Sequence, residues 1–414
     1  MVDHALEPAL PVDWQKLWAP EIKDFIRKHD HVDVAALALK KPPAADWPYA
    51  LIMDQIKARQ KAKSKLPRWV DGPDNLLFPL ADILEQASSG VTARYKASLI
   101  KGKIFCDLTG GAGVDSCALS EHYTSGTCID IDKKNAALLA HNLPLLCPKT
   151  CSIKVSCFPA EEFVKTMPSV DLVLLDPQRR DSGRKGKFRL EDGSPDILAL
   201  LPHLRTKASA IMLKTSPVLD ITQALELLGC VQAVHILEWR GECREVVYIM
   251  GGDRAKMHPL ETIPITAVRL DDEGCVLSAL TFTRKEEGKA HADYALPERY
   301  LYEPGPAFLK AGGFSLLATH YGLKKLHKHT HLYTAQALCT DFPGRIFEIA
   351  GRYPVQRKAL PFSKAHLAVR NFPDGAESLK KKLGLKDGGE EFLFACTLAD
   401  ESKALLHGRK VGAG

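Results

Sequence analysis

Short apolar segments alternate with amphipathic segments through the middle of the chain. Ile104, Phe105 and Cys106 form a run long enough for one buried strand, and similar runs recur after it. The predicted strands cover residues 104–107, 127–129, 152–157, 171–175, 208–213 and 231–239. Apolar residues at helical spacing predict helices over residues 114–120, 133–143 and 218–228. Alternating strands and helices indicate an α/β domain built on a parallel sheet.

The last strand of this region is expected to run against the others. Residues 240–244 are predicted to form a tight turn, after which residues 246–250 return as a strand. A hairpin at this point reverses the final strand of an otherwise parallel sheet. We therefore expect a sheet that is parallel except for its antiparallel last strand.

The N-terminal part lacks strand-like alternation. Residues 13–30 and 46–63 are predicted to form amphipathic helices, separated by Lys41-Pro42-Pro43. We expect residues 1–75 to form a helical segment packed on the sheet domain. The alternative is a basic arm for a substrate, formed by Lys57, Arg59, Lys61, Lys63 and Arg68.

The pattern changes again after about residue 257. Residues 263–270 and 275–282 alternate as a small hairpin would, and residues 306–321 are predicted to form a helix. The remaining predicted elements are strands 345–350, 366–370 and 391–397 and a helix over residues 376–383. This part of the chain is predicted to form small α+β domains.

A glycine-rich turn follows the first predicted strand. The strand ends in Asp107, Gly110, Gly111 and Gly113 form the turn, and a helix can begin at residue 114. Strand, glycine turn and helix start together make a nucleotide-type site, because glycine permits unusual dihedrals and close approach of a ligand.

The details of this turn select the kind of nucleotide. A dinucleotide fingerprint needs a third glycine, where this chain has Ser116, and Asp107 would place a carboxylate beside a pyrophosphate. A carboxylate suits a cationic ligand instead, and S-adenosylmethionine carries an ammonium group and a sulfonium. Asp130 lies 23 residues after Asp107, at the end of the second strand, where an acid can bind ribose hydroxyls.

Several motifs together carry a resemblance to a known family. The stretches EQASSGVTARYKA, DLTGGAGVD, DPQRR, LKTSP and RGECRE resemble those of bacterial class I S-adenosylmethionine-dependent methyltransferases with C-terminal ferredoxin-like and THUMP-like domains. The resemblance covers most of the chain and implies a Rossmann-like α/β sheet with an antiparallel last strand. It implies a helical segment at 1–75, a methyltransferase domain at 76–255, a ferredoxin-like α+β domain at 256–333 and a THUMP-like domain at 334–414.

The resemblance also implies which residues bind the methyl donor. The position of the expected adenine-binding acid is occupied by Pro159, and Glu161 follows two residues later. Two alternatives stay open: Glu161 substitutes for that acid, or adenine is held by backbone and apolar contacts alone. The expected donor-binding residues are Asp107, Thr109, Gly110, Gly111, Gly113, Asp130, Ile131 and Glu161.

The segment after the fourth strand is the best candidate for acceptor binding. In related amino-methyltransferases an acid or amide, two prolines and an aromatic residue hold a planar nitrogen in line with the methyl group, and positioning supplies much of the catalysis. This chain keeps Asp176 and Pro177 but has Gln178 and Arg179 at the next two positions. The missing ring argues against methylation of a base amine. Arg179 and Arg180 are candidates for binding phosphate or an acidic group.

Three residues elsewhere are weaker candidates for substrate binding. Thr92 and Lys96 lie on a helix that Ser88 or Ser89 can cap, and related enzymes place such a helix beside the donor. The alternative is a helix used only for packing. Lys214 ends the fifth strand and either faces the substrate or neutralises Asp176.

Composition narrows the choice of partner and compartment. The chain has 414 residues, a net charge of +6, and basic runs at 57–68, 179–189 and 324–328, which are either solvated faces or contacts to a polyanion. Its eleven cysteines follow no disulfide or zinc spacing, so we expect reduced thiols. The motif HKHTH at 327–331 is consistent with a metal site or a basic loop, and we expect no metal. With no apolar stretch long enough to span a bilayer, we expect a cytoplasmic protein that does not bind membranes.

These observations lead to a functional hypothesis. We expect a methyltransferase that uses S-adenosylmethionine and acts on RNA, either tRNA or rRNA, because THUMP domains serve RNA-modifying enzymes. THUMP domains usually precede the catalytic domain, whereas this one follows it. Two alternatives stay open: a non-catalytic RNA-binding protein on the same fold, and a methyltransferase that acts on a protein or a small molecule.

Overall fold

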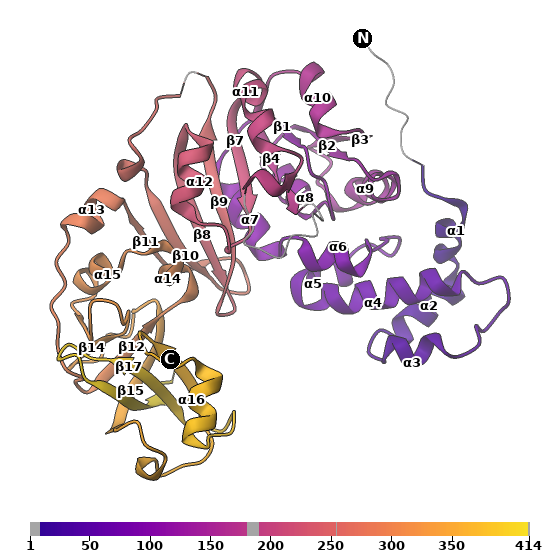
Figure 1. Cartoon of the computed structure of the whole chain (residues 1–414). Helices are drawn as coiled ribbons and strands as arrows, with labels where there is room; N and C mark the ends of the chain where they lie inside the picture. The colour runs from indigo at the N-terminus through magenta and orange to yellow at the C-terminus, as the bar shows by residue number, and fades with distance from the viewer. Residues whose placement is uncertain (1–8, 180–189, 254, 413–414) are drawn as a thin grey trace. The chain divides into compact units, whose positions relative to one another are not determined.

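The structure is a computed structural model that describes residues 9–179, 190–253 and 255–412 (Figure 1). The chain divides into two compact units. Unit 1 consists of Met1–Ala233, Glu245–His258 and Leu270–Cys275, and unit 2 of Val234–Arg244, Pro259–Arg269 and Val276–Gly414.

The N-terminal part of unit 1 is helical, as predicted. The predicted helix 13–30 is broken at Pro20, which begins α2, and the predicted helix 46–63 corresponds to α4. The described elements are α1 Val12–Gln15, a 3-10 turn Lys16–Trp18, α2 Pro20–Lys28, α3 Val34–Ala38, α4 Tyr49–Lys65, α5 Pro67–Val70 and α6 Ala81–Gln86. Their shared core includes Leu138 of the sheet domain, and the Asn142 side chain binds the backbone of Leu77 at 2.6 and 3.2 Å. The helical segment therefore packs on the sheet domain.

Most of the cations on α4 are paired within unit 1. Arg59 and Lys63 lie 3.4 and 3.0 Å from carboxylate oxygens of Asp30, and Lys61 lies 3.4 Å from Glu85. Lys65 donates hydrogen bonds to carbonyl oxygens at the C-terminal end of α6. These contacts give the basic residues of α4 a structural role, and their use as a substrate arm stays a prediction.

The sheet of unit 1 has the predicted mixed topology. Its strands lie in the order β9-β7-β4-β1-β2-β3, and all pair in parallel except β9, which runs antiparallel to β7. The strands are β1 Ile104–Asp107, β2 Ser125–Asp130, β3 Ser152–Cys157, β4 Val170–Leu175, β7 Ala208–Thr215 and β9 Glu242–Gly251. The helices that alternate with them along the chain are α7 Gly90–Leu99, α8 Val114–Ser120, α9 Lys133–Leu146, α10 Ala160–Thr166, α11 Ile197–Lys207 and α12 Ile221–Leu228 (Figure 1). The carboxyl ends of β1, β2 and β4 therefore share one edge of the sheet.

Unit 2 contains a second, seven-stranded sheet in the order β13-β14-β12-β15-β18-β17-β16. These strands are β12 Tyr300–Pro304, β13 Lys324–Lys325, β14 Tyr333–Ala335, β15 Gly344–Tyr353, β16 His366–Arg370, β17 Phe392–Thr397 and β18 Lys403–Lys410. Three other strands lie in the order β11-β10-β8, with bounds β8 Val231–Trp239, β10 Ile265–Leu270 and β11 Val276–Phe282. The helices of this part are α13 Arg284–Lys289, α14 Pro306–Ala311, α15 Phe314–His320 and α16 Ala376–Leu383.

One predicted helix of unit 2 is wrong in detail. The helix expected over residues 306–321 is two helices, α14 and α15, separated by Gly312 and Gly313. Gly312 has φ +80°, a left-handed conformation that ends a helix and that glycine adopts without steric cost. No helix in the described part of the chain combines the length and apolar composition needed to cross a bilayer.

Candidate active site

A cavity of about 310 Å³ opens at the carboxyl edge of the sheet of unit 1. Parallel sheets of this type hold their ligands at this edge, where the loops after the strands converge. The lining residues come from the loops after β1, β2, β3 and β4 and from the segment before α11: Leu108, Thr109, Gly111, Asp130, Ile131, Asp132, Asn135, Phe158, Ala160, Glu161, Asp176, Gln178, Ser194 and Pro195, together with Ile83 of α6.

The glycine turn is packed against helix α9 and has no room for side chains at two positions. A Cβ atom on Gly110 or Gly113 would come within 2.7 Å of a methyl carbon of Leu139, and Gly113 has φ +80°. Gly111 has φ +53° and lines the cavity. Both the close packing and the left-handed backbone therefore require the glycines that the sequence predicted for this turn.

Asp107 lies beneath this turn, and it is absent from the described lining of the cavity. Its side chain is 1% exposed and accepts hydrogen bonds from Ser116 Oγ at 2.7 Å and from the Thr109 amide at 3.0 Å. Burial raises the pKa of Asp107 to about 7, although both hydrogen bonds oppose the shift. The structure thus gives Asp107 the position of a support for the turn, and direct contact with a donor stays a prediction.

Asp130 presents a fixed carboxylate to the cavity. One oxygen accepts a hydrogen bond from the Asp132 amide at 2.9 Å, and the other accepts from the Gly111 amide at 3.0 Å and from Asn135 Nδ2 at 2.5 Å. Asn135 also donates to the Gly111 carbonyl at 2.6 Å, which ties α9 to the glycine turn. Burial raises the pKa of Asp130 despite these bonds. Sequence reasoning predicted Asp130 but did not single out Asn135, which is held by its place in the first turn of α9.

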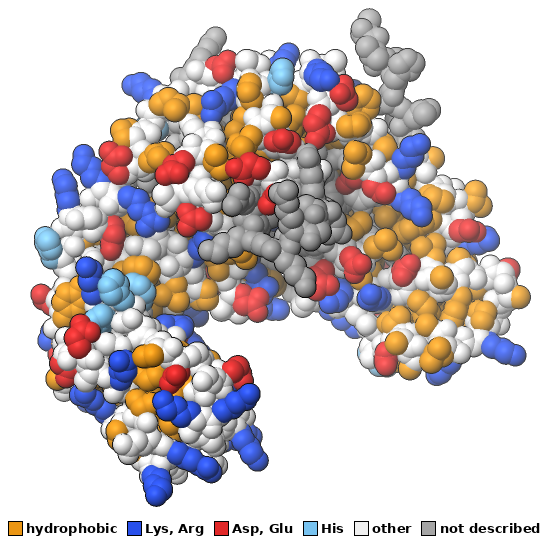
Figure 2. All heavy atoms as spheres, viewed as in Figure 1, with side chains coloured by type: hydrophobic (Ala, Val, Ile, Leu, Met, Phe, Trp, Pro, Cys, Tyr) orange, Lys and Arg blue, Asp and Glu red, His pale blue; other side chains and the backbone are white. Residues whose placement is uncertain are grey.

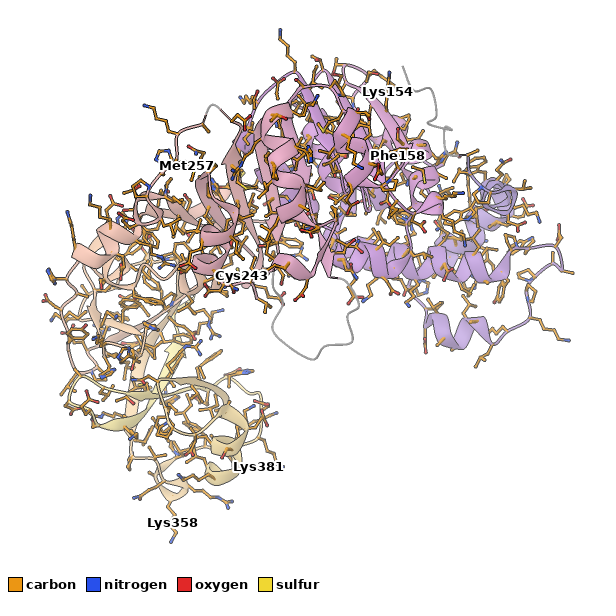
Figure 3. The ribbon with its side chains drawn as sticks, turned by 45° about the horizontal axis from the view of Figure 1, so that its top comes forward. Lys154, Phe158, Cys243, Met257, Lys358 and Lys381 are labelled. Atoms are coloured by element: carbon orange, nitrogen blue, oxygen red, sulfur yellow. The ribbon has the colours of Figure 1, made fainter. Side chains whose placement is uncertain are left out.

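Two exposed apolar side chains line the same cavity. Ile131 is 71% exposed and Phe158 is 36% exposed, and such side chains are suited to contact the faces of a flat ring. Phe158 follows the end of β3 and is labelled in Figure 3. Glu161 also lines the cavity, whereas Pro159 serves as the residue before α10. Sequence reasoning missed Phe158, although an aromatic residue directly after a strand was visible in the sequence.

Another side of the cavity is formed by the segment after β4. The side chain of Asp176 is 33% exposed and forms an ion pair with Lys214 Nζ, and the Asp176 amide donates to Thr109 Oγ1 at 2.7 Å. Pro177 is buried beneath a short ribbon in which β5 Gln178–Arg179 pairs with β6 Gly193–Ser194. Gln178 and Ser194 line the cavity. The side chain of Arg179, and Arg180 as a whole, lie outside the described residues.

A buried network of charges extends behind Asp176. Lys96 Nζ lies 2.6 Å from Glu245 Oε2 and 2.8 Å from Asp115 Oδ1, and it donates to Ser88 Oγ at 2.7 Å. Ser88 in turn donates to the second oxygen of Asp115 at 2.7 Å. The side chains of Lys96, Glu245 and Lys214 are 2%, 3% and 9% exposed, so the network is nearly closed to solvent.

The electrostatics of this network differ from group to group. Burial would raise the pKa of Asp115, but attraction to Lys96 and Lys214 lowers it. Burial raises the pKa of Asp176, and the neighbouring Lys214 only partly offsets that rise. Burial opposes the charge of Lys214, but the surrounding carboxylates, Asp176 first, raise its pKa overall.

The three weaker candidates for substrate binding differ in their surroundings: Thr92 lies in the buried cap of a helix, whereas Lys96 and Lys214 belong to the charge network. Thr92 is fully buried, and its amide donates to Ser89 Oγ at 3.1 Å, which caps α7 as expected. Lys96 and Lys214 both belong to the charge network, and Lys214 pairs with Asp176, one of the two interpretations left open above. The sequence analysis assigned no role to Asp115 or Glu245, although they are the last residues of the motifs DLTGGAGVD and RGECRE.

The three histidines of the motif HKHTH lie in a loop of unit 2. His327 Nε2 lies 3.0 Å from Glu401 Oε1, and Nδ1 lies 3.0 Å from Asn371 Nδ2. His331 stacks on Phe314 with ring centroids 3.5 Å apart, and burial lowers its pKa to about 4. Across residues 9–179, 190–253 and 255–412 there is no group of three or more side chains arranged to hold a metal ion.

Comparisons with known proteins cover both units. Family models match a ferredoxin-like domain at residues 300–343 and a THUMP domain-like segment at residues 344–410. The crystal structure of a "putative methyltransferase" from Porphyromonas gingivalis W83 is 31% identical, with a TM-score of 0.83, and the alignment covers 96% of this chain and 99% of that protein.

Sequence relatives support the same relationship over a shorter region. An uncharacterized S-adenosylmethionine-dependent methyltransferase of Mycobacterium tuberculosis H37Rv is 27% identical over 164 residues, and its counterpart in strain CDC 1551 gives the same values. The matched region is 40% of this chain and 43% of each relative, so it spans less than half the length of those proteins.

Proposed function

We propose that this protein transfers a methyl group to RNA. The premise is that the chain belongs to the family of class I S-adenosylmethionine-dependent methyltransferases with C-terminal ferredoxin-like and THUMP-like domains. The observation that carries the proposal is a single cavity in which a donor-type half, built on Asp130, adjoins an acceptor-type half, built on Asp176. Both halves lie at the sheet edge where ligands of this fold bind.

The residues of the first half fit the donor. Asp130, held by three hydrogen bonds, has the fixed carboxylate that ribose hydroxyls need. Ile131 and Phe158 offer apolar surface for adenine, and Glu161 lies near them in the lining. The glycine turn and Thr109 would receive the amino-acid end. When bound, S-adenosylmethionine supplies a methyl group activated by a positively charged sulfur.

The residues of the second half would position the acceptor. The Asp176 carboxylate accepts a hydrogen bond from the acceptor atom, and the Thr109 hydroxyl fixes the backbone of Asp176 relative to the glycine turn. Gln178 and Ser194 form the wall of this half. Holding the acceptor in line with the methyl group supplies much of the rate enhancement in such reactions.

The C-terminal domains support RNA as the acceptor. Figure 2 shows Lys and Arg side chains gathered over the C-terminal domain at the lower left, and Figure 3 shows Lys358 and Lys381 projecting from it. Both lysines are exposed, and neither forms an ion pair with another residue that the structure describes. Unpaired cations on a domain that resembles RNA-associated modules favour contact with a phosphate backbone.

A labelling experiment tests this proposal. The protein is incubated with methyl-labelled S-adenosylmethionine and total RNA from a strain that lacks its gene, with the Asp176→Asn variant as a matched control. We expect label in a discrete RNA band with the native protein and at least a hundredfold less with the variant. Donor binding by calorimetry without any labelling of RNA would refute RNA methylation, and would favour either of the alternatives named above: an RNA-binding protein without chemistry or another substrate.

A further inference from the structure

Five ionisable side chains gather at and behind Asp176 in the cavity wall, of which Lys96, Lys214 and Glu245 are buried and Asp115 and Asp176 are partly exposed. They are Lys96 on α7, Asp115 on α8, Asp176 after β4, Lys214 on β7 and Glu245 on β9. Burying two cations and the Glu245 carboxylate costs several kcal/mol per ion before attraction to the neighbouring charges offsets it, and an apolar core of the same shape is often more stable. A cluster assembled from five separate elements is therefore better explained by chemistry at the site than by stability.

We propose that the group methylated by this protein is a hydroxyl, specifically the 2′-hydroxyl of a ribose in RNA, because this charge network favours a hydroxyl acceptor. The inference rests on the proposed function for its macromolecule and goes beyond it in naming the atom that is methylated. Asp176 is the proton acceptor, Lys214 beside it is the cation that stabilises the charge on the acceptor oxygen, and Lys96 and Glu245 are positioning residues behind them.

The charge that develops on the acceptor distinguishes oxygen from nitrogen. A neutral nitrogen becomes positively charged as it attacks the methyl group, so a buried ammonium beside it is unfavourable. A hydroxyl loses its proton and develops negative charge on oxygen, which a fixed cation stabilises strongly in a site shielded from water. Lys214 forms an ion pair with Asp176 at the point where the acceptor would bind, which is the arrangement that favours a hydroxyl.

The shape of the acceptor loop agrees with this choice. A base amine needs a flat aromatic surface for stacking, and in this chain Gln178 follows Pro177. A ribose hydroxyl needs no such surface. It needs a hydrogen-bond acceptor, which Asp176 provides, and polar groups for the sugar edge, which Gln178 and Ser194 can provide from the cavity wall.

The transfer step balances in protons and electrons. The O–H bond of the ribose hydroxyl breaks and its proton passes to the Asp176 carboxylate, while an oxygen lone pair forms the new bond to the methyl carbon. The methyl–sulfur bond breaks at the same time, and its electron pair stays on sulfur. The proton on Asp176 then passes to water.

The surroundings of Asp176 suit it to accept a proton. The groups that act on it are Lys214 in direct contact, with Lys96 and Asp115 at longer range, and Asp107 is also influenced by its charge. Burial raises the pKa of Asp176 above that of an ordinary aspartate, which makes the carboxylate a better base. Lys96 and Glu245 lie 2.6 Å apart on the far side of the network, and the charge of Glu245 also helps to raise the pKa of Lys214.

The chemistry of the product tests the inference directly. Total RNA labelled as described above is hydrolysed completely in alkali, which cleaves RNA by attack of each 2′-hydroxyl on the neighbouring phosphate. A 2′-O-methyl group removes that nucleophile, so we expect the label in alkali-resistant dinucleotides. Label in mononucleotides would overturn the hydroxyl acceptor while leaving RNA methylation intact. Absence of label from all RNA would instead overturn the proposed function, and this inference with it.

A second experiment tests the role of Lys214 with a readout besides activity. We expect Lys214→Met to lower the transfer rate at least a hundredfold and Lys214→Arg to retain part of it. Calorimetric affinity for S-adenosylhomocysteine should stay within threefold in both variants, which shows that they are folded. Exposed Lys134→Met serves as the matched control and should change neither quantity. A transfer rate within threefold of the native rate in Lys214→Met would overturn the proposal.

Discussion

Lys96→Met removes the cation at the centre of the buried charge network while keeping a side chain of similar length. Lys96 makes one contact of 2.6 Å to Glu245, one of 2.8 Å to Asp115 and one of 2.7 Å to Ser88. Its loss leaves two buried carboxylates without their nearest counter-charge. Breaking a buried ion pair from one side costs about 3–5 kcal/mol, and we expect the free energy of unfolding of unit 1 to fall by about 4 kcal/mol at pH 7.

Denaturant unfolding monitored by tryptophan fluorescence measures this change. Four of the five tryptophans, Trp14, Trp18, Trp47 and Trp69, belong to unit 1, so the signal follows mainly that unit. Because a neutral pair removes the uncompensated charge of Glu245, the double variant Lys96→Met with Glu245→Gln should recover about 1–3 kcal/mol. Lys134→Met, an exposed lysine, should stay within about 0.5 kcal/mol of the native protein.

The pH dependence gives a second check on the same variant. Attraction to Lys96 and Lys214 holds the pKa of Asp115 below its usual value, so Asp115 adds stability above its unfolded pKa of about 3.9, and this contribution is lost as the pH falls through the folded pKa. The difference between the native protein and Lys96→Met should therefore be fully developed at pH 7 and, as far as it depends on Asp115, shrink below about pH 4, where Asp115 of the native protein takes up its proton. A cost below about 1 kcal/mol at pH 7, or a double variant no more stable than the single one, would refute the reasoning.

Three further predictions concern the glycine turn and the donor half of the cavity. Asp107→Asn should reduce the pH dependence of the free energy of unfolding. With a pKa raised to about 7, Asp107 contributes up to about 4 kcal/mol that is fully present below about pH 4 and is lost as the pH rises through 7. An equal change in the free energy of unfolding between pH 5 and pH 8 in the native protein and the variant would contradict this. Phe158→Ala should weaken S-adenosylhomocysteine binding by about 1–2 kcal/mol in calorimetry, because the proposed contact between the ring and adenine is removed, and Phe372→Ala of unit 2 should leave the affinity unchanged. Gly113→Ala should destabilise unit 1 by at least about 1 kcal/mol, because a Cβ atom would lie 2.7 Å from Leu139 at φ +80°, whereas Gly375→Ala, with no atom within 4 Å of the added carbon, should not.

The sequence predicted those parts of the fold that depend on local signals. The bounds of α8, β3, β8, β16 and α16 match the predictions, because each is an apolar or amphipathic run bounded by polar residues, glycine or proline. Strands β12 and β18 were missed, since their identity as strands depends on pairing with β15, far away in the chain. The division of the chain into four domains at the boundaries given above stays a prediction.

The candidate site was predicted where a motif fixes the backbone. The glycine turn, Asp130 and Asp176 follow directly from strand ends, and a strand end determines where its next residue lies. The Lys96–Glu245 pair joins residues 149 positions apart and could not be inferred from either motif alone. Asp107 shows the opposite limit, because the sequence identifies an acid at the strand end but not whether its side chain faces the ligand or the core.

The seven-stranded sheet joins two family segments that would otherwise be expected to evolve separately. The two matched family segments meet inside that sheet, where β12 of the first pairs with β15 of the second. Glu303 of β12 is almost fully buried and receives hydrogen bonds from Arg345 at 2.7 Å and from Arg370 at 2.8 Å. Separating the two segments at residue 343 would expose the edge of β12 on one fragment and the edge of β15 on the other. It would also leave the Glu303 carboxylate without Arg345 and Arg370. Because they share one sheet, we expect the ferredoxin-like and THUMP-like segments to be inherited together as one structural unit.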